Sequence, residues 1–182
     1  MSLLRRLFLA ALLAATALGA GAQTDTRVGP YLVVAAGRAQ YDYDCWYWSS
    51  CDTARASMGK VGGGYRFGVW ALEGWYFDLG KATIFPASDR LRLAGGAVTG
   101  AWYLPLGTQL EGLLRAGLAD VRQTRSGDSG ESRFTGIFGL GLVVKLAPAV
   151  ALELGWDVTG GEGRNSGTTT GAAVSLGLRV GF

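Results

Sequence analysis

The chain has 182 residues, 49% of them hydrophobic, with 30 glycines and 4 prolines, a composition that fits one folded domain and not a disordered chain. Its 17 lysines and arginines nearly balance 14 aspartates and glutamates, so the chain has no basic stripe for nucleic acid. It has no histidine, the usual proton carrier of enzymes near neutral pH, and no nucleophile beside an activating base, so we assign no catalytic residues.

Residues 1–22 are typical of an export signal. Arg5 and Arg6 precede an apolar stretch of 14 residues that ends at Ala20, and Ala20-Gly21-Ala22 supplies the small-x-small cleavage pattern. The stretch is short for a membrane helix, which needs about 20 residues. We therefore expect cleavage after Ala22, which leaves residues 23–182 as one exported domain.

The rest of the chain has no run of 18 apolar residues that would form a membrane helix. Instead, apolar residues alternate with polar or small ones, as in strands with one apolar face. Eight such segments follow in chain order, over residues 31–38, 60–67, 70–76, 91–103, 110–118, 133–145, 150–158 and 174–182. An apolar exported chain without spanning helices can enter lipid only as a closed sheet, because closure pairs every backbone group.

The alternation is clearest near the C-terminus. Between residues 150 and 158 large apolar side chains share one face, and Glu153 and Asp157 lie on the other. Between residues 174 and 182 the apolar face ends at Phe182, with Arg179 opposite. A soluble barrel or sandwich also alternates, around a packed apolar core. Unbroken rows of large apolar residues opposite charges and glycines favour lipid outside and a narrow polar interior.

The connections between these segments alternate between long and short. Long polar connections are expected over residues 41–53, 81–89, 123–131 and 159–168, and short turns over residues 66–68, 105–108 and 147–149. Outer-membrane barrels have this asymmetry, with short periplasmic turns and longer outer loops. The sequence therefore predicts an all-β fold, an eight-stranded antiparallel up-and-down transmembrane β-barrel, in the bacterial outer membrane.

Three short stretches resemble known outer-membrane barrels. Residues 71–82 (ALEGWYFDLGKA) and 63–67 (GGYRF) resemble the third strand and the end of the second strand of the small OmpA-type barrel family. The terminal sequence LRVGF is similar to the C-terminal aromatic signal of outer-membrane barrels. The resemblance implies insertion by the outer-membrane assembly machinery through Phe182, and it places Glu73 and Arg115 inside the barrel.

Charges on the polar faces are expected to pair inside the barrel. A basic side chain that faced lipid at mid-bilayer would cost about 2–4 kcal/mol, and buried charges need partners. The predicted interior network consists of Glu73, Glu111, Arg115, Lys145, Glu153 and Arg179. It acts either as a plug that holds the barrel shut or as a gate that switches partners to pass small ions.

The first long connection holds both cysteines of the chain. Cys45 and Cys51 flank Trp46-Tyr47-Trp48-Ser49-Ser50, and an exported chain meets an oxidising compartment, so we predict a disulfide. Two thiols without histidine make a poor metal site. The aromatic side chains of Trp46, Tyr47 and Trp48 either pack over the barrel mouth or contact lipopolysaccharide or a surface partner.

Other aromatic residues and glycines have simpler expected roles. Tyr65, Phe67, Tyr103 and Phe182 fall near strand ends and are predicted to form an interfacial girdle. The run Gly62-Gly63-Gly64 is expected either to leave room for bulky neighbouring side chains or to mark a kink in the sheet.

Three classes of function remain open, none with a cofactor. The favoured one is a structural envelope barrel with a charged, plugged interior and at most weak pore activity, because eight strands leave an interior only just wide enough for side chains. The alternatives are a surface adhesin that acts through the long loops, especially residues 45–51, and a soluble lipocalin-like barrel. Expected partners are outer-membrane lipid and lipopolysaccharide, the assembly machinery, and a host or surface ligand of unknown identity.

Overall fold

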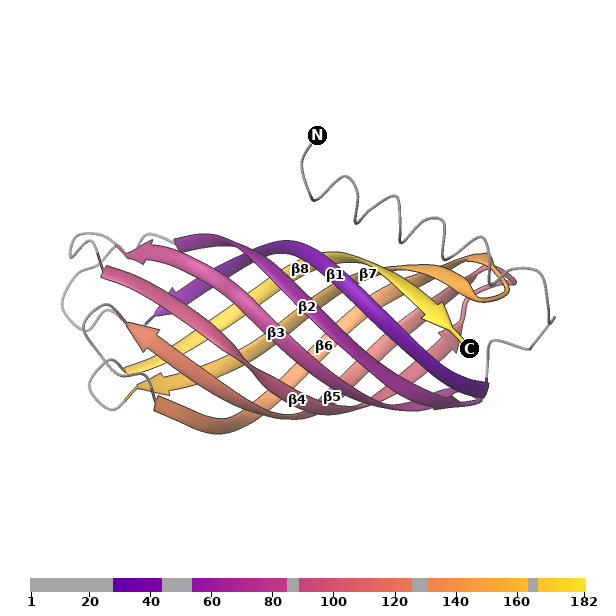
Figure 1. Cartoon of the computed structure of the whole chain (residues 1–182), viewed down its shortest axis with the longest axis horizontal. Helices are drawn as coiled ribbons and strands as arrows, with labels where there is room; N and C mark the ends of the chain where they lie inside the picture. Colours follow the sequence, from indigo (N-terminus) through magenta and orange to yellow (C-terminus); the bar gives the residue numbers. More distant parts are fainter. Residues whose placement is uncertain (1–27, 44–53, 85–88, 126–130, 164–166) are drawn as a thin grey trace.

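The chain folds into a closed barrel of eight antiparallel strands (Figure 1). The computed structural model describes residues 28–43, 54–84, 89–125, 131–163 and 167–182. The strands are β1 (Val28–Tyr43), β2 (Ala54–Phe67), β3 (Trp70–Ile84), β4 (Asp89–Pro105), β5 (Leu110–Arg125), β6 (Glu131–Ala147), β7 (Val150–Gly163) and β8 (Gly167–Gly181). Within these ranges, no helix is long and apolar enough to cross a membrane.

The number of strands and their antiparallel order confirm the fold predicted from the sequence. The strands are longer than predicted, with 14 to 17 residues each, and they extend into all four of the expected long connections. For example, Gln123 pairs with Glu131, and Glu162 pairs with Thr168. The ladder continues through these polar residues because backbone hydrogen bonds need no apolar face.

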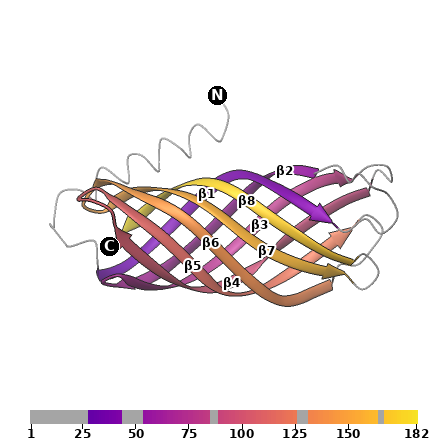
Figure 2. The ribbon, with the colours of Figure 1, turned by 180° about the vertical axis from the view of Figure 1, so that it is seen from behind.

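The barrel closes between its first and last strands. β1 pairs with β8 from Tyr31 opposite Gly181 to Tyr43 opposite Thr169, and both views show the two strands side by side (Figures 1 and 2). The backbone N–H of Phe182 donates to the carbonyl of Pro30 at 3.0 Å. Closure leaves no unpaired sheet edge for another chain to join.

The two ends of the barrel differ. We call the end that holds Val28, Phe182 and the β2–β3, β4–β5 and β6–β7 turns the turn end, and the opposite end the loop end. The three turns span residues 68–69, 106–109 and 148–149, close to the short turns predicted.

The outer wall is apolar along most of its length. Its exposed large hydrophobic side chains come from all eight strands and include Leu32, Val34, Val61, Leu72, Tyr76, Val98, Leu118, Phe138, Leu140, Leu154, Trp156, Val174 and Leu176. Near the turn end, Trp70 and Trp102 stack with their ring centroids 5.5 Å apart. Because these residues alternate with buried ones along each strand, the apolar face is the outside of the barrel.

The predicted aromatic girdle is partly wrong. Tyr65, Phe67 and Phe182 are exposed on the outside near the turn end, but Tyr103 is fully buried in the interior. Trp102 and Tyr103 are adjacent aromatics, and only one of them can face outward in a strand. The outward position belongs to Trp102, which pairs with Trp70.

The interior is less polar than the sequence suggested. Its loop-end half is filled by apolar side chains, namely Tyr41, Met58, Phe77, Leu79, Leu91, Leu93, Val121 and Ile137. Most of the buried charges lie in the middle and toward the turn end. An eight-stranded barrel has no room for a water column, so apolar side chains can pack in its interior as they do in a soluble core.

A bulge in β3 adjusts which residues face inward near the loop end. The β3–β4 register shifts between Asp78 and Lys81, where Gly80 has a φ of +81° that favours glycine. The backbone N–H of Gly80 donates to Asp78 Oδ1 at 2.9 Å, and Tyr41 Oη donates to the Gly80 carbonyl at 2.7 Å. As a result, Ala82 faces inward although the earlier inward residues of β3 carry odd numbers.

Gly62 leaves room for a bulky neighbour, as predicted, because the Trp75 ring occupies the space where a side chain at position 62 would lie. A Cβ at Gly62 would lie 2.4 Å from Trp75 Cε3 and 2.5 Å from the Gly74 carbonyl oxygen. We therefore expect Gly62→Ala to lower the free energy of unfolding in detergent by about 1–3 kcal/mol, measured by urea titration with tryptophan fluorescence.

Gly74→Ala is the matched control on the neighbouring strand, because a Cβ there meets nothing within 4 Å. It should change the free energy of unfolding by less than about 0.5 kcal/mol. If both variants unfolded at the same urea concentration, the close approach of Trp75 would not constrain this wall.

Candidate functional site

The buried carboxylate of Glu73 is surrounded by hydrogen-bond donors from three strands. Its Oε1 accepts from Tyr31 Oη at 2.5 Å and from Tyr103 Oη at 3.2 Å. Its Oε2 accepts from Trp75 Nε1 and Thr99 Oγ1, both at 3.1 Å. These neutral donors replace the water that the carboxylate would otherwise need.

A second carboxylate, Glu153 on β7, receives two arginines. Arg115 Nη2 donates to Oε1 at 2.7 Å, and Arg179 Nη2 donates to Oε2 at 2.5 Å. Lys60 donates to Asp157 Oδ2 at 2.6 Å and lies 3.9 Å from Glu153. The cluster therefore holds charges of both signs in direct contact, as buried ions require.

The same arginines bind Glu73 and so join opposite walls. Arg115 Nε lies 3.2 Å from Glu73 Oε2, and Arg179 Nη2 lies 3.7 Å from Glu73 Oε1. Glu73 and Glu153 stand on β3 and β7, four strands apart around the barrel. We call Lys60, Glu73, Arg115, Glu153, Asp157 and Arg179 the central cluster.

Aromatic rings cover the faces of the arginines. The guanidinium carbon of Arg115 lies 4.5 Å from the Trp75 ring centroid, and that of Arg179 lies 4.2 Å from the Tyr31 ring centroid. Cation–π contacts of this kind strengthen when water is excluded. Each central arginine therefore has carboxylates beside its guanidinium nitrogens and an aromatic ring against its face.

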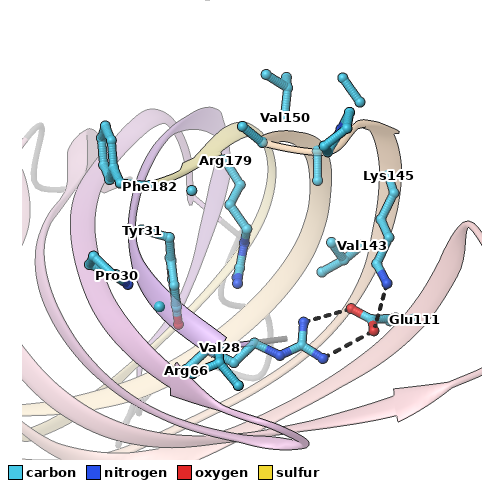
Figure 3. Close-up of a pocket in the computed structure, with 16 residues that line it drawn as sticks. Val28, Pro30, Tyr31, Arg66, Glu111, Val143, Lys145, Val150, Arg179 and Phe182 are labelled. Atoms are coloured by element: carbon cyan, nitrogen blue, oxygen red, sulfur yellow. Dashed lines mark hydrogen bonds and ion pairs between the residues drawn. The ribbon is translucent and has the colours of Figure 1, made fainter. Parts of the chain in front are cut away.

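A second, smaller cluster lies at the turn end around Glu111 (Figure 3). Arg66 forms two hydrogen bonds with the Glu111 carboxylate, at 2.8 and 3.0 Å, and Lys145 Nζ lies 3.1 Å from Glu111 Oε1. Arg66 also lies 4.0 Å above the Tyr103 ring, and Tyr103 Oη accepts from Arg179 at 2.5 Å. Tyr103 thus connects this turn-end cluster to the central cluster.

The six residues of the predicted network all lie in the interior, but they form two groups. Glu73, Arg115, Glu153 and Arg179 meet in the central cluster, whereas Glu111 and Lys145 meet at the turn end. Glu111 is four residues nearer the turn than Arg115 on the same strand, so it lies in a different layer.

Sequence reasoning missed other members of these clusters. Asp157 lies on the same face of β7 as Glu153, so strict alternation would have included it. Lys60 and Arg66 are separated from each other by glycines, which hide the alternation of β2. The buried tyrosines Tyr31 and Tyr103 had no signal in the sequence that separated them from girdle aromatics.

Small cavities remain around the clusters. One of about 60 Å³ opens at the turn end beside Arg66, Glu111 and Arg179, where Tyr31 and Arg179 point into the space shown in Figure 3. Another of about 20 Å³ lies between Trp75, Arg115 and the apolar half. Since a water molecule needs roughly 10–15 Å³ by this measure, these cavities have room for only a few waters.

Several predicted features fall outside the described residues. They are the export signal over residues 1–22, Cys45 and Cys51 with their disulfide, and the loop aromatics Trp46, Tyr47 and Trp48. Within the ranges that the structure does describe, no group of three or more histidine, cysteine, aspartate or glutamate residues could hold a metal ion.

Comparisons with solved structures support the fold. The barrel is similar to Neisserial surface protein A, with 19% sequence identity, a TM-score of 0.67, and coverage of 85% of this chain and 97% of that one. It is also similar to the outer membrane protein AlkL, solved in lipid bilayers, with 10% identity, a TM-score of 0.51, and coverage of 86% and 91%. No protein-family model matches the chain, and no curated protein matches its sequence. The chain therefore shares the fold of small outer-membrane barrels.

Loss of the Glu153 charge should destabilise the barrel, because Arg115 and Arg179 would both lose a buried partner. We expect Glu153→Gln to lower the free energy of unfolding by about 3–5 kcal/mol. The measurement is urea unfolding of the detergent-solubilised barrel, read by the loss of its compact gel mobility.

Asp78→Asn is the matched control, because Asp78 pairs with Arg92 on the outer wall, where the two side chains are 30% and 41% exposed. This exposed pair should contribute at most about 1 kcal/mol. Similar losses in the two variants would argue against a special role for the central cluster.

Proposed function

We propose that this chain is an integral outer-membrane β-barrel with a structural role in the cell envelope and without catalytic activity. The apolar outer wall supports this, since contiguous exposed apolar surface on this scale is rare on soluble monomers. A closed sheet with an apolar exterior satisfies its backbone without water, which is the condition for crossing lipid.

The observation that carries the structural role is the central cluster. Arg115 and Arg179 each bind both Glu73 and Glu153, and so tie walls that face each other across the interior. Among the described residues, apolar side chains fill the loop-end half, and the two cavities beside the clusters have room for only a few waters. These contacts favour a plug over a gate.

The orientation and export route follow from the same proposal. The turn end faces the periplasm and the loop end faces the cell exterior, because the longest connection, residues 44–53, joins β1 to β2 at the loop end and outer-membrane barrels carry their long loops outside. Residues 1–22 direct export and are cleaved. Phe182, which is exposed directly after β8, is recognised by the assembly machinery.

The adhesin alternative depends on residues 45–51, which lie outside the described ranges.

Cell fractionation tests the location and the role together. The tagged full chain should be recovered in the outer-membrane fraction, and its gel mobility should shift on boiling, because a closed barrel stays folded in cold detergent. Deleting the gene should make the cells more sensitive to detergent. A gene copy that encodes serine in place of Trp46, Tyr47 and Trp48 should restore resistance as well as the wild-type copy does.

Two results would contradict the proposal. Recovery as a soluble periplasmic protein without detergent would mean that the apolar wall is covered in another way. A triple-serine variant that folds but fails to restore resistance would favour the surface-binding alternative instead.

Planar lipid bilayers test the plug. The wild-type barrel should show no stable open channel, because side chains fill its interior. Trp75→Ala combined with Arg115→Ala removes one ring and one cation from the centre and should produce measurable single-channel current. A wild-type barrel that conducts steadily would show that the clusters act as an open or switching gate.

A further inference from the structure

A cleft of about 460 Å³ lies on the outer wall toward the loop end. It crosses four neighbouring strands, β2, β1, β8 and β7, which run side by side in Figure 2. The side chains that shape it belong to Arg38, Gln40, Arg55, Trp156, Ala172 and Val174. The small side chain of Ala172, which lies between Gln40 and Val158 in the register, leaves the hollow.

The two arginines of this cleft stand close enough to bind one anion. Arg38 pairs with Ser57 and Arg55 pairs with Gln40, so the arginines occupy diagonal positions on adjacent strands. Diagonal neighbours lie about 7–8 Å apart, within reach of long side chains. Both are exposed on the outside of the barrel.

Within the described ranges, no carboxylate pairs with either arginine of the cleft. Among the described residues, neither Arg38 nor Arg55 forms an ion pair, and Asp42, the next acidic residue outward on β1, binds neither of them. Arg92, at a similar level on β4, shows the contrast because Asp78 neutralises it. The cleft therefore presents two positive charges to an outside ligand.

The position of the cleft points to a ligand with both charge and apolar chains. Along one cross-strand row, Arg38 is followed by Val174 and Trp156, both exposed. The next outward-facing row toward the turn end contains Leu176 and Leu154, which belong to the apolar wall. Arginine and tryptophan at the edge of an apolar wall are typical of a membrane–water interface.

We propose that this cleft binds the phosphorylated headgroup of a lipid in the outer leaflet, of the lipid A class found in lipopolysaccharide. The phosphate lies between Arg38 and Arg55, whose guanidinium groups fit phosphate oxygens in pairs. The acyl chains lie along Val174 and Trp156. The inference rests on the proposed membrane location, because only there does such a lipid meet this surface at high concentration.

Native mass spectrometry of the full chain in zwitterionic detergent tests the site, with bisphosphorylated lipid A as the probe. The wild type should bind this lipid more tightly than lipid A with both phosphates removed. The double variant Arg38→Gln/Arg55→Gln should weaken binding of the phosphorylated form about tenfold and leave binding of the dephosphorylated form unchanged. Ala172→Leu, which fills the hollow without changing charge, should also weaken binding.

The control is Arg90→Gln/Arg122→Gln, which removes two exposed positive charges from β4 and β5 on the other side of the barrel. It should bind phosphorylated lipid A as the wild type does. Equal loss in both double variants would overturn the site in favour of general charge attraction. Unchanged binding by Arg38→Gln/Arg55→Gln would overturn it directly. Displacement of the lipid by equimolar inorganic phosphate would also overturn the lipid site, because it would show that the cleft binds any small phosphate anion.

The test separates this inference from the proposed function. The double variant should still reach the outer membrane and still shift in mobility on boiling, because its changes lie outside the central cluster. If the wild type failed that fractionation test, the membrane role would fail. If the wild type passed and lipid binding did not depend on Arg38 and Arg55, only the lipid site would fail.

Discussion

The barrel interior is only just wide enough for side chains, and its centre holds ion pairs between two arginines, Arg115 and Arg179, and two glutamates, Glu73 and Glu153. The arrangement of the opposite walls depends on these ion pairs. Each of the two carboxylates accepts hydrogen bonds from side chains on several strands, so a strand that carries one of these donors cannot move without breaking its bond to a buried charge. The crowded interior also limits side-chain size at neighbouring positions. Gly62 has no side chain, and the Trp75 ring fills the space that a side chain there would need.

Buried ion pairs are often no more stabilising than apolar residues of the same size. In the membrane location that we propose, the comparison is different, because a strand that slips by one residue turns its inward charges toward lipid. A slip of β7 would expose Glu153 and Asp157 on the apolar wall. The central cluster therefore specifies strand register, and its tyrosines and tryptophan complete the hydrogen bonds that the carboxylates need.

The outer wall shows a matching difference between its ends. Aromatic side chains, among them Trp70 and Trp102, gather near the turn end, while arginines border the apolar wall toward the loop end. Rings with a polar edge suit either interface, whereas arginine clusters suit the side that carries phosphate. The barrel thus combines an interior that fixes its shape with an exterior whose two borders differ in chemistry.

The sequence by itself determined the class of fold and the faces of most strands, because alternation with a period of two is a local property of each strand. Alternation, the cost of a charge that faces lipid, and the resemblance at Glu73 and Arg115 together placed all six predicted charges inside. Only the tertiary structure decided which charges meet, since the layer of each residue depends on the stagger summed around the closed barrel. That stagger brings Arg66 and Lys145 to Glu111, and it brings Tyr103 next to Glu73.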